Sequence, residues 1–293
     1  MKANRKVGKT LLSPFNSYEN YPSFPEPKKI QVSGPVIVPK KQPAPKTPNE
    51  LLYYGFHAVR AVYKNRREDV IRAYCTEERL EEMGDILKFC AKNKKAYHVV
   101  SKEDLEKITL SVHHEGVALL AKRKVNLSEQ ELYASLESKR QPLIVLDAVS
   151  NPHNIGSIMR IMAHFGWNYL ICDENYFMPL SASAARMSEG GSEFVDFISY
   201  QNQNVFLNKL KSLGYQTLGT STHGRKSFYS VPLQTKSCAI FLGNEIAGLS
   251  KDLIKKLDVT VAIPSMGEVQ SLNVAMATTL FIGECVRQDG LKK

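Results

Sequence analysis

The chain is 293 residues long, with 43% hydrophobic and 23% charged residues and a formal net charge of +10. This length suits two domains better than one. The sequence opens without an apolar leader and has no long apolar run, so neither a secretory signal nor a membrane span is predicted. The five cysteines form no C-x-x-C pair and no cluster with histidines, so we expect no disulfide framework, no metal site and a cytoplasmic location.

Residues 1–49 form a basic, proline-rich tail that we expect to be disordered. Nine of the fourteen prolines fall there, without the apolar period of a helix or strand. Nine basic and two acidic residues give this segment +7 of the chain's +10. Such a segment is typical of an arm that gains affinity for a polyanion, or of a solubilising leader without a partner.

Residues 50–124 are predicted to form a small α/β domain. A helical period covers residues 51–65, where Leu52, Phe56, Val59 and Val62 share one face. A charged helix and short apolar strands follow, at 77–93 for the helix and at 70–75, 96–100 and 116–122 for the strands.

Residues 125–141 are polar with a weak helical period, and we interpret them as a linker. From residue 142 to 293, apolar strands alternate with helical stretches, which indicates an α/β domain with a mostly parallel sheet. Its strands are predicted at 143–148, 169–173, 194–200, 215–221, 238–243 and 259–264.

Three loops of this second α/β domain follow predicted strands, which is where open α/β sheets bind their ligands. The first loop, 147–167, contains Asn154, which is positioned to cap a helix, and Arg160, which projects from that helix more than one turn later. Either residue alone is explained as well by ordinary helix chemistry.

The second loop, 242–250, turns on Gly243 and Gly248 around Glu245. In the third loop, 262–284, Ser271 to Asn273 open a long apolar helix. Each of these is also compatible with a simple turn or helix start.

In this order, however, N-x-G-x-x-x-R, G-x-E-x-x-G-L and I-P-x-x-G-x-V-x-S-L-N-V-x-x-A resemble the three signature motifs of SpoU/TrmH-type RNA 2'-O-ribose methyltransferases of the SPOUT superfamily. The resemblance spans roughly residues 142–288. It implies S-adenosylmethionine as cofactor, RNA as substrate, a trefoil knot that binds the cofactor, and a homodimer formed through the knot. A chain threaded in this way is otherwise nearly absent from proteins.

The resemblance also implies site residues. The family's polar set corresponds here to Asn154, Arg160, Glu245, Ser271 and Asn273. The cofactor's adenine and ribose are expected to meet the backbone of Gly243, Ile263 and Leu272, and the cavity is expected to be lined by Leu242, Asn244, Gly248, Met266 and Thr220.

Chemically, a ribose oxygen must displace the sulfonium methyl group. Arginine is almost never neutral, so we expect Arg160 to grip an RNA phosphate and stabilise the developing alkoxide rather than act as a base. Ser271 and Asn273 are expected to orient the hydroxyl, and Glu245 to fix Arg160 or neighbouring loops. In two places the chain departs from the family: Asn151 stands where Asp is common, and Ser265 separates Pro264 from Met266.

Residues 50–124 also resemble the substrate-binding domain that precedes many SpoU-type catalytic domains, which favours a structured target, ribosomal RNA before transfer RNA. His113, His114, Glu115 and Gly116 are expected in a loop suited to RNA. A catalytically silent RNA-binding relative remains the alternative. A Rossmann-type enzyme is disfavoured because no strand is followed by G-x-G-x-x-G, and the P-loop signature is also missing.

Overall fold

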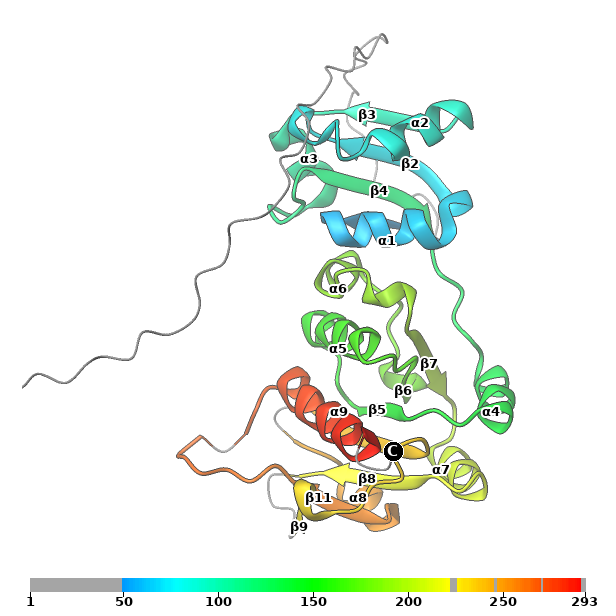
Figure 1. Ribbon diagram of the computed structural model, residues 1–293, viewed down its shortest axis with the longest axis vertical. Helices are drawn as coiled ribbons and strands as arrows, with labels where there is room; N and C mark the ends of the chain where they lie inside the picture. The colour runs from blue at the N-terminus through cyan, green and yellow to red at the C-terminus, as the bar shows by residue number, and fades with distance from the viewer. Residues whose placement is uncertain (1–48, 222–225, 245–246, 270, 291–293) are drawn as a thin grey trace, which may run out of the picture. The chain divides into compact units, whose positions relative to one another are not determined.

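The computed structural model describes residues 49–221, 226–244, 247–269 and 271–290, which form two β-sheets with flanking helices (Figure 1). Of the predicted tail, all but Asn49 lies outside the described residues. No helix within these ranges is both long and apolar enough to cross a membrane.

The first sheet has four strands in the order β1-β4-β2-β3. Strand β4 pairs antiparallel with β1 and β2, whereas β2 and β3 are parallel. The strands are β1 (Glu50–Tyr54), β2 (Val70–Cys75), β3 (Ala96–Val99) and β4 (Val117–Lys122). Helices α1 (Phe56–Arg66) and α2 (Gly84–Lys92) pack with one buried cluster of this sheet, and α3 (Lys102–Thr109) packs with another. We refer to residues 50–124 as the N-terminal module.

The helix predicted over residues 51–65 is wrong in its first part. Residues 50–54 form β1, in which Leu51 and Tyr53 are buried, and the helix begins only at Phe56. Between them Gly55 has a φ of 86°, a conformation that glycine adopts readily and that ends the strand. The apolar residues before Gly55 therefore belong to a strand, although their spacing imitates a helical face.

The second sheet has seven strands in the order β7-β6-β5-β10-β8-β11-β9, and every pair in it is parallel. This confirms the predicted mostly parallel α/β architecture. The strands are β5 (Leu143–Asp147), β6 (Tyr169–Asp173), β7 (Asp196–Tyr200), β8 (Gln216–Thr220), β9 (Lys226–Ser227), β10 (Cys238–Gly243) and β11 (Val259–Ala262).

Helices cover both faces of the seven-stranded sheet. Along β5, Ile144 and Leu146 join the core beneath α5 (Pro152–His164) and α9 (Val274–Gly290). Leu143 and Val145 join the core on the other face, with α4 (Glu129–Ser138), α7 (Gln203–Ser212) and α8 (Lys251–Lys256). Strands buried on both sides read as continuous apolar runs, as they do in this sequence.

Two short elements matter for the site. Helix α6 (Ala182–Met187) packs against α5 (Figure 1). It is followed by a 3₁₀ turn, Gly191–Glu193, that also contacts α5. Within the predicted linker, α4 begins with a capping box in which Ser128 and Glu131 satisfy each other's backbone N–H groups.

Candidate active site

The three motif loops leave the same edge of the seven-stranded sheet. Strand β10 lies between β5 and β8, and Gly243 at its end pairs with Asp147 at the end of β5. Strand β11 continues the parallel sheet beside β8. Because the carboxyl ends of parallel strands share one edge, the loops after β5, β10 and β11 begin close together.

Direct hydrogen bonds join the first and second loops. The Asn244 side chain donates from Nδ2 to the carbonyl of Ala148 at 3.0 Å. The backbone N–H of Ser250 donates to Asp147 Oδ2 at 3.1 Å. Ala148 itself has a φ of 55°, in the left-handed region that non-glycine residues rarely adopt. The turn after β10 is therefore tied to the turn after β5.

Gly243 is required by the close approach of the second loop to itself. A Cβ atom at this position would lie 2.2 Å from the backbone carbon of Gly248 and 2.3 Å from the nitrogen of Leu249. No side chain fits such a gap, so the motif glycine keeps the backbone of this loop compact.

The first and third loops are joined by two asparagines. Asn273 Nδ2 donates to Asn154 Oδ1 at 3.0 Å. At the same time Asn273 Oδ1 accepts from the backbone N–H of Ala275 at 2.9 Å, which caps the start of α9. Asn154 is buried, at 9% exposure, so this contact forms the inner end of the cluster.

The prediction that Asn154 caps a helix is wrong. The cap of α5 is Asn151, whose side chain accepts from the N–H of His153 at 2.9 Å, and Pro152 occupies the first helical position. Proline suits that position because its missing N–H has no partner there in any case. Asn154 therefore lies inside the first turn, where its side chain is available to Asn273.

Arg160 occupies a separate part of α5. It lies six residues, about 9 Å of axial rise, beyond Asn154. Its side chain is 63% exposed, and Nη1 lies 3.9 Å from Glu189 Oε1. The structure thus brings Asn154 and Asn273 together, while Arg160 faces the region of α6.

The predicted cofactor residues differ widely in exposure. Leu242 is buried in β10, and Gly243, Asn244 and Ile263 are half-buried. Thr220 ends β8 and its hydroxyl donates to the carbonyl of Phe241 at 3.0 Å. Gly248, Met266, Ser271 and Leu272 are exposed, while Glu245 lies outside the described residues.

This lining fits the adenosyl group of S-adenosylmethionine. The edge offers backbone polar groups beside a glycine without room for a side chain, together with the apolar side chains of Leu242, Ile263 and Leu272. A neutral ring system is held well by such a surface, since no extra charge must be buried. Across the described part of the chain no group of three or more His, Cys, Asp or Glu side chains is placed to hold a metal ion.

Two acidic residues of this region were missed in the sequence analysis. Asp147 accepts from the second loop, as described above, and its place near the end of the strand predicted at 143–148 is the signal that marks it. Glu189 is the described carboxylate beside Arg160, and nothing in the local sequence pattern indicates that it lies there.

Comparison with known proteins gives the same picture along most of the chain. Residues 141–283 match the model of the SpoU rRNA Methylase family, and residues 52–126 match the family described as RNA 2'-O ribose methyltransferase substrate binding. The uncharacterized tRNA/rRNA methyltransferase YfiF of Escherichia coli O157:H7 is 30% identical over 280 residues, which cover 94% of this chain and 80% of that protein.

Other relatives carry more specific names. The 23S rRNA (guanosine-2'-O-)-methyltransferase RlmB of Neisseria meningitidis serogroup B is 28% identical over 83% of this chain and 98% of its own. In fold, the chain is similar to an RNA 2'-O ribose methyltransferase crystal structure, with a TM-score of 0.69, 20% identity and coverage of 82% and 89% of the two chains. It is also similar to the SpoU methyltransferase AviRb of Streptomyces viridochromogenes in complex with AdoMet, with a TM-score of 0.67, 20% identity and coverage of 83% and 92%.

The sequence identity to YfiF, the two family matches and the parallel α/β fold with its three linked loops agree with one another. The chain belongs to the SpoU/TrmH family of RNA methyltransferases.

Proposed function

We propose that this protein transfers a methyl group from S-adenosylmethionine to a ribose 2'-hydroxyl in structured RNA, ribosomal RNA before transfer RNA. The observation that carries the proposal is the hydrogen-bonded cluster of the three motif loops, in which Asn273 meets Asn154 and Asn244 meets Ala148. The name of RlmB, which acts on a guanosine 2'-O position of 23S rRNA, supports ribosomal RNA as the target.

Each polar residue has a distinct role in this proposal. S-adenosylmethionine, when bound, supplies the methyl group on its sulfonium. Arg160 binds an RNA phosphate and stabilises the oxyanion that forms as the hydroxyl loses its proton, since its exposed guanidinium offers a bidentate donor pair. Asn273 uses both side-chain polar atoms within the protein, so we assign it to ordering the loop and leave the orientation of the hydroxyl to the exposed Ser271. Glu245 retains the loop-fixing role that the family resemblance implies.

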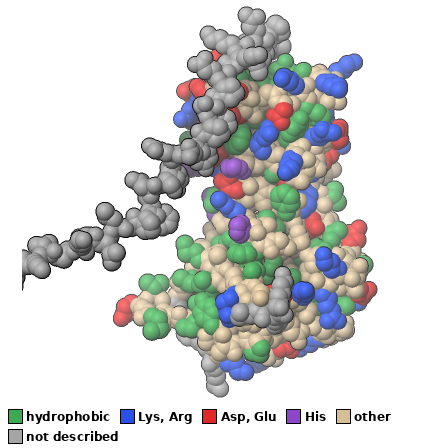
Figure 2. Space-filling view, viewed as in Figure 1, with side chains coloured by type: hydrophobic (Ala, Val, Ile, Leu, Met, Phe, Trp, Pro, Cys, Tyr) green, Lys and Arg blue, Asp and Glu red, His purple; other side chains and the backbone are tan. Residues whose placement is uncertain are grey.

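A homodimer formed through a knotted third motif is part of the proposal. Figure 2 shows hydrophobic side chains on the protruding segment between β11 and α9. That segment and α9 expose large apolar side chains at Met266, Val269, Leu272, Met276 and Leu280. Apolar surface gathered in this way favours a protein partner, and a second copy would bring its Arg160 toward this site.

The division of labour along the chain is also proposed. Residues 50–124 bind the RNA, residues 125–141 connect, and residues 142–293 carry out the transfer, while the basic segment 1–49 adds non-specific affinity for phosphates.

Calorimetric titration with S-adenosylmethionine separates this enzyme from a catalytically silent relative, because a silent binder needs no cofactor site. We expect binding by the wild type and by Gly84→Ala, where an added Cβ meets nothing within 4 Å. Gly243→Ala is expected to lose binding, because its Cβ would collide with the second loop.

Methyl transfer is then measured with tritiated cofactor and total RNA from cells that lack the gene. We expect label in alkali-stable dinucleotides, since a methylated 2'-oxygen cannot attack the neighbouring phosphate. A protein that binds the cofactor but labels no RNA, or that binds no cofactor at all, would contradict the proposal.

A further inference from the structure

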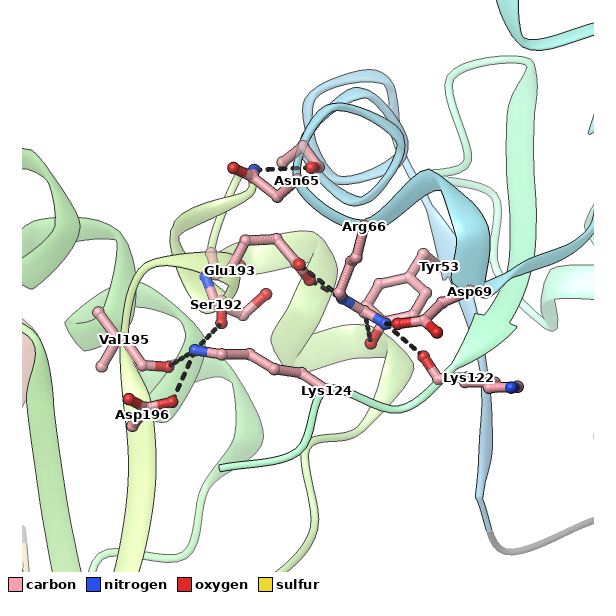
Figure 3. Close-up of polar contacts among 12 residues, drawn as sticks. Tyr53, Asn65, Arg66, Asp69, Lys122, Lys124, Ser192, Glu193, Val195 and Asp196 are labelled. Carbon is pink, nitrogen blue, oxygen red and sulfur yellow. Dashed lines mark hydrogen bonds and ion pairs between the residues drawn. The ribbon is translucent and has the colours of Figure 1, made fainter. Parts of the chain in front are cut away.

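A short turn after α6 is connected to the N-terminal module at both of its ends, directly at Glu193 and through Arg186 at Glu189. We call residues Glu189–Glu193 the clamp turn. At one end the Glu193 carboxylate, whose side chain is only 2% exposed, accepts from Arg66 Nε at 2.7 Å and Nη2 at 3.1 Å (Figure 3). Arg66 also donates to the Tyr53 hydroxyl at 2.7 Å. Burial alone would lower the pKa of Arg66, but its bonds to Glu193 raise it, so the buried pair stays charged.

The other end of the clamp turn is held through Arg186 of α6. This arginine donates from Nη1 to Glu189, from Nη2 to Glu115, and from Nε to the carbonyl of His113 at 3.1 Å. Gly55 makes room for it, because a Cβ there would lie 2.2 Å from Arg186 Cδ. One guanidinium therefore joins the clamp turn to the loop that precedes β4.

The middle of the clamp turn lies against Arg160. A Cβ on Gly191 would be 2.9 Å from the Cα of Arg160 and 2.8 Å from the carbonyl oxygen of Met159. Glu189 Oε1, which accepts from Arg186, is also the oxygen that lies 3.9 Å from Arg160 Nη1. Two arginines thus share one carboxylate oxygen, with Arg186 much the closer.

Backbone strain indicates that this arrangement is maintained at a cost in conformational free energy. Glu115 and Glu189, the two carboxylates that Arg186 joins, have φ angles of 54° and 49°. Non-glycine residues persist in this left-handed region only where their surroundings fix them, and such positions cluster at functional sites. Both strained residues are acceptors of the same guanidinium.

We propose that Arg186 is a positioning residue that keeps Glu189 at the 3.9 Å of a long ion pair with Arg160, beyond hydrogen-bond distance, and so keeps the Arg160 guanidinium available to an RNA phosphate. This inference rests on the proposed function. Without Arg186, the Glu189 carboxylate closes from 3.9 Å to hydrogen-bond distance of Arg160 and competes with the phosphate for it. Because Arg186 is itself held by Glu115 and His113, the contacts of the N-terminal module help to keep the Arg160 guanidinium available to phosphate.

The test is whether Glu189→Gln reverses the effect of Arg186→Gln on methyl transfer. Arg186→Gln is expected to lower kcat/KM for tritium transfer to total RNA about fivefold, the scale of a partly exposed ion pair. The double variant Arg186→Gln/Glu189→Gln is expected to recover to within about twofold of the wild type, since the competing carboxylate is gone. Lys209→Gln, which breaks the 2.7 Å pair with Glu137 on the sheet face opposite α5, is the matched control and is expected to leave the rate unchanged.

RNA binding by the cofactor-free protein gives a second measurement that needs no methyl transfer. Filter binding to the same RNA across a salt series is expected to show a slope reduced by about one in Arg186→Gln and restored in the double variant. If Arg186→Gln unfolds at a lower temperature than the wild type, Arg186→Lys replaces it in both measurements. We then expect a smaller loss of kcat/KM and of RNA binding, which Glu189→Gln again reverses. Reversal of binding without any methyl transfer by the wild type would overturn the proposed function but not this inference.

Three outcomes overturn the inference itself. They are an Arg186→Gln variant equal to the wild type in both measurements, a double variant that is as impaired as Arg186→Gln, and a double variant that is more impaired than Arg186→Gln. The last two are what a purely structural role for Arg186 predicts, because removal of Glu189 would then add to the damage.

Discussion

The two ends of helix α5 are held in different ways. At its start, the buried Asn154 is bonded to Asn273, and both residues come from loops of the same seven-stranded sheet. Farther along, Arg160 is 63% exposed, and its nearest described carboxylate belongs to a turn that is tied to the N-terminal module. One end is completed by loops of its own sheet, whereas the other depends on a turn that is bonded to the N-terminal module. We infer that cofactor binding and RNA engagement are separable by mutation within one helix.

The largest expected effect comes from removing the Arg160 side chain at the exposed end of α5. Arg160→Ala should lower methyl transfer by about 10²–10³-fold, the usual loss when one donor to a developing oxyanion is removed. Calorimetry should find the affinity for S-adenosylmethionine unchanged, because the cluster around Asn154 is intact. Near-normal turnover with tritiated cofactor would remove Arg160 from the chemistry, and a lost cofactor affinity would show that the two ends are not separable.

Breaking the buried pair that anchors the clamp turn is expected to be mainly a stability effect. Arg66→Met leaves the Glu193 carboxylate buried without its partner, at a cost of about 3 kcal/mol in the free energy of unfolding. Arg60→Met, which breaks a pair whose side chains are 38% and 48% exposed, should cost less than about 1 kcal/mol. Denaturant unfolding measures both, and equal losses would mean that the anchor is no stronger than a surface contact.

Two substitutions of Asn273 separate its two hydrogen bonds at the inner end. Asn273→Ser keeps a side-chain cap for α9 but loses the bond to Asn154, for an expected loss of about 1 kcal/mol. Asn273→Ala loses the cap as well, for about 1 kcal/mol more. Thermal unfolding checks the difference. Equal destabilisation by Ser and Ala would show that the cap contributes nothing.

The inner end of α5 could be predicted from sequence far better than the outer end. Strand boundaries such as Cys238–Gly243 agreed with prediction because strands buried on both faces give unbroken apolar runs. The three motifs were found by their joint order, and the structure places Asn154 and Asn273 in contact. Asn154 was mistaken for the cap because Asn151, three residues earlier, has the same capping chemistry.

The contacts of the outer end had no sequence signal. Arg186 and Glu115 are 71 residues apart, and Arg66 and Glu193 are 127 apart. Charged residues at such separations look like ordinary solvated surface in a single sequence, because only the packing of α1 and α6 brings them together. Lys124 is a further example of a contact without a sequence signal. It lies in a basic run that suggests phosphate binding, but its ammonium group contacts Asp196 at 2.9 Å (Figure 3).

The smallest expected effect is a pH dependence in the loop that holds Arg186. His114 is 1% exposed, its Nδ1 accepts from the Gly116 N–H at 2.9 Å, and its Nε2 has no hydrogen-bond partner among the described residues. Burial lowers the pKa of His114 below its ordinary value of 6.5. The folded protein therefore favours neutral His114. The contribution of this preference to the free energy of unfolding is complete above pH 6.5 and is lost as the pH falls below that value toward the folded pKa.

Comparison with His114→Asn isolates this contribution, since the amide oxygen can replace Nδ1 as acceptor but does not titrate. The melting temperature of the wild type should fall more steeply than that of the variant between pH 6.5 and 5, and the two curves should run parallel between pH 7 and 8. His98, whose pKa is also lowered by burial, is present in both proteins and cancels. Parallel curves over the whole range would mean that His114 is not held neutral. The loop that carries Glu115 would then contribute no pH dependence to the outer end of α5. The two ends of the helix would differ only in their exposure and in the partners of their side chains.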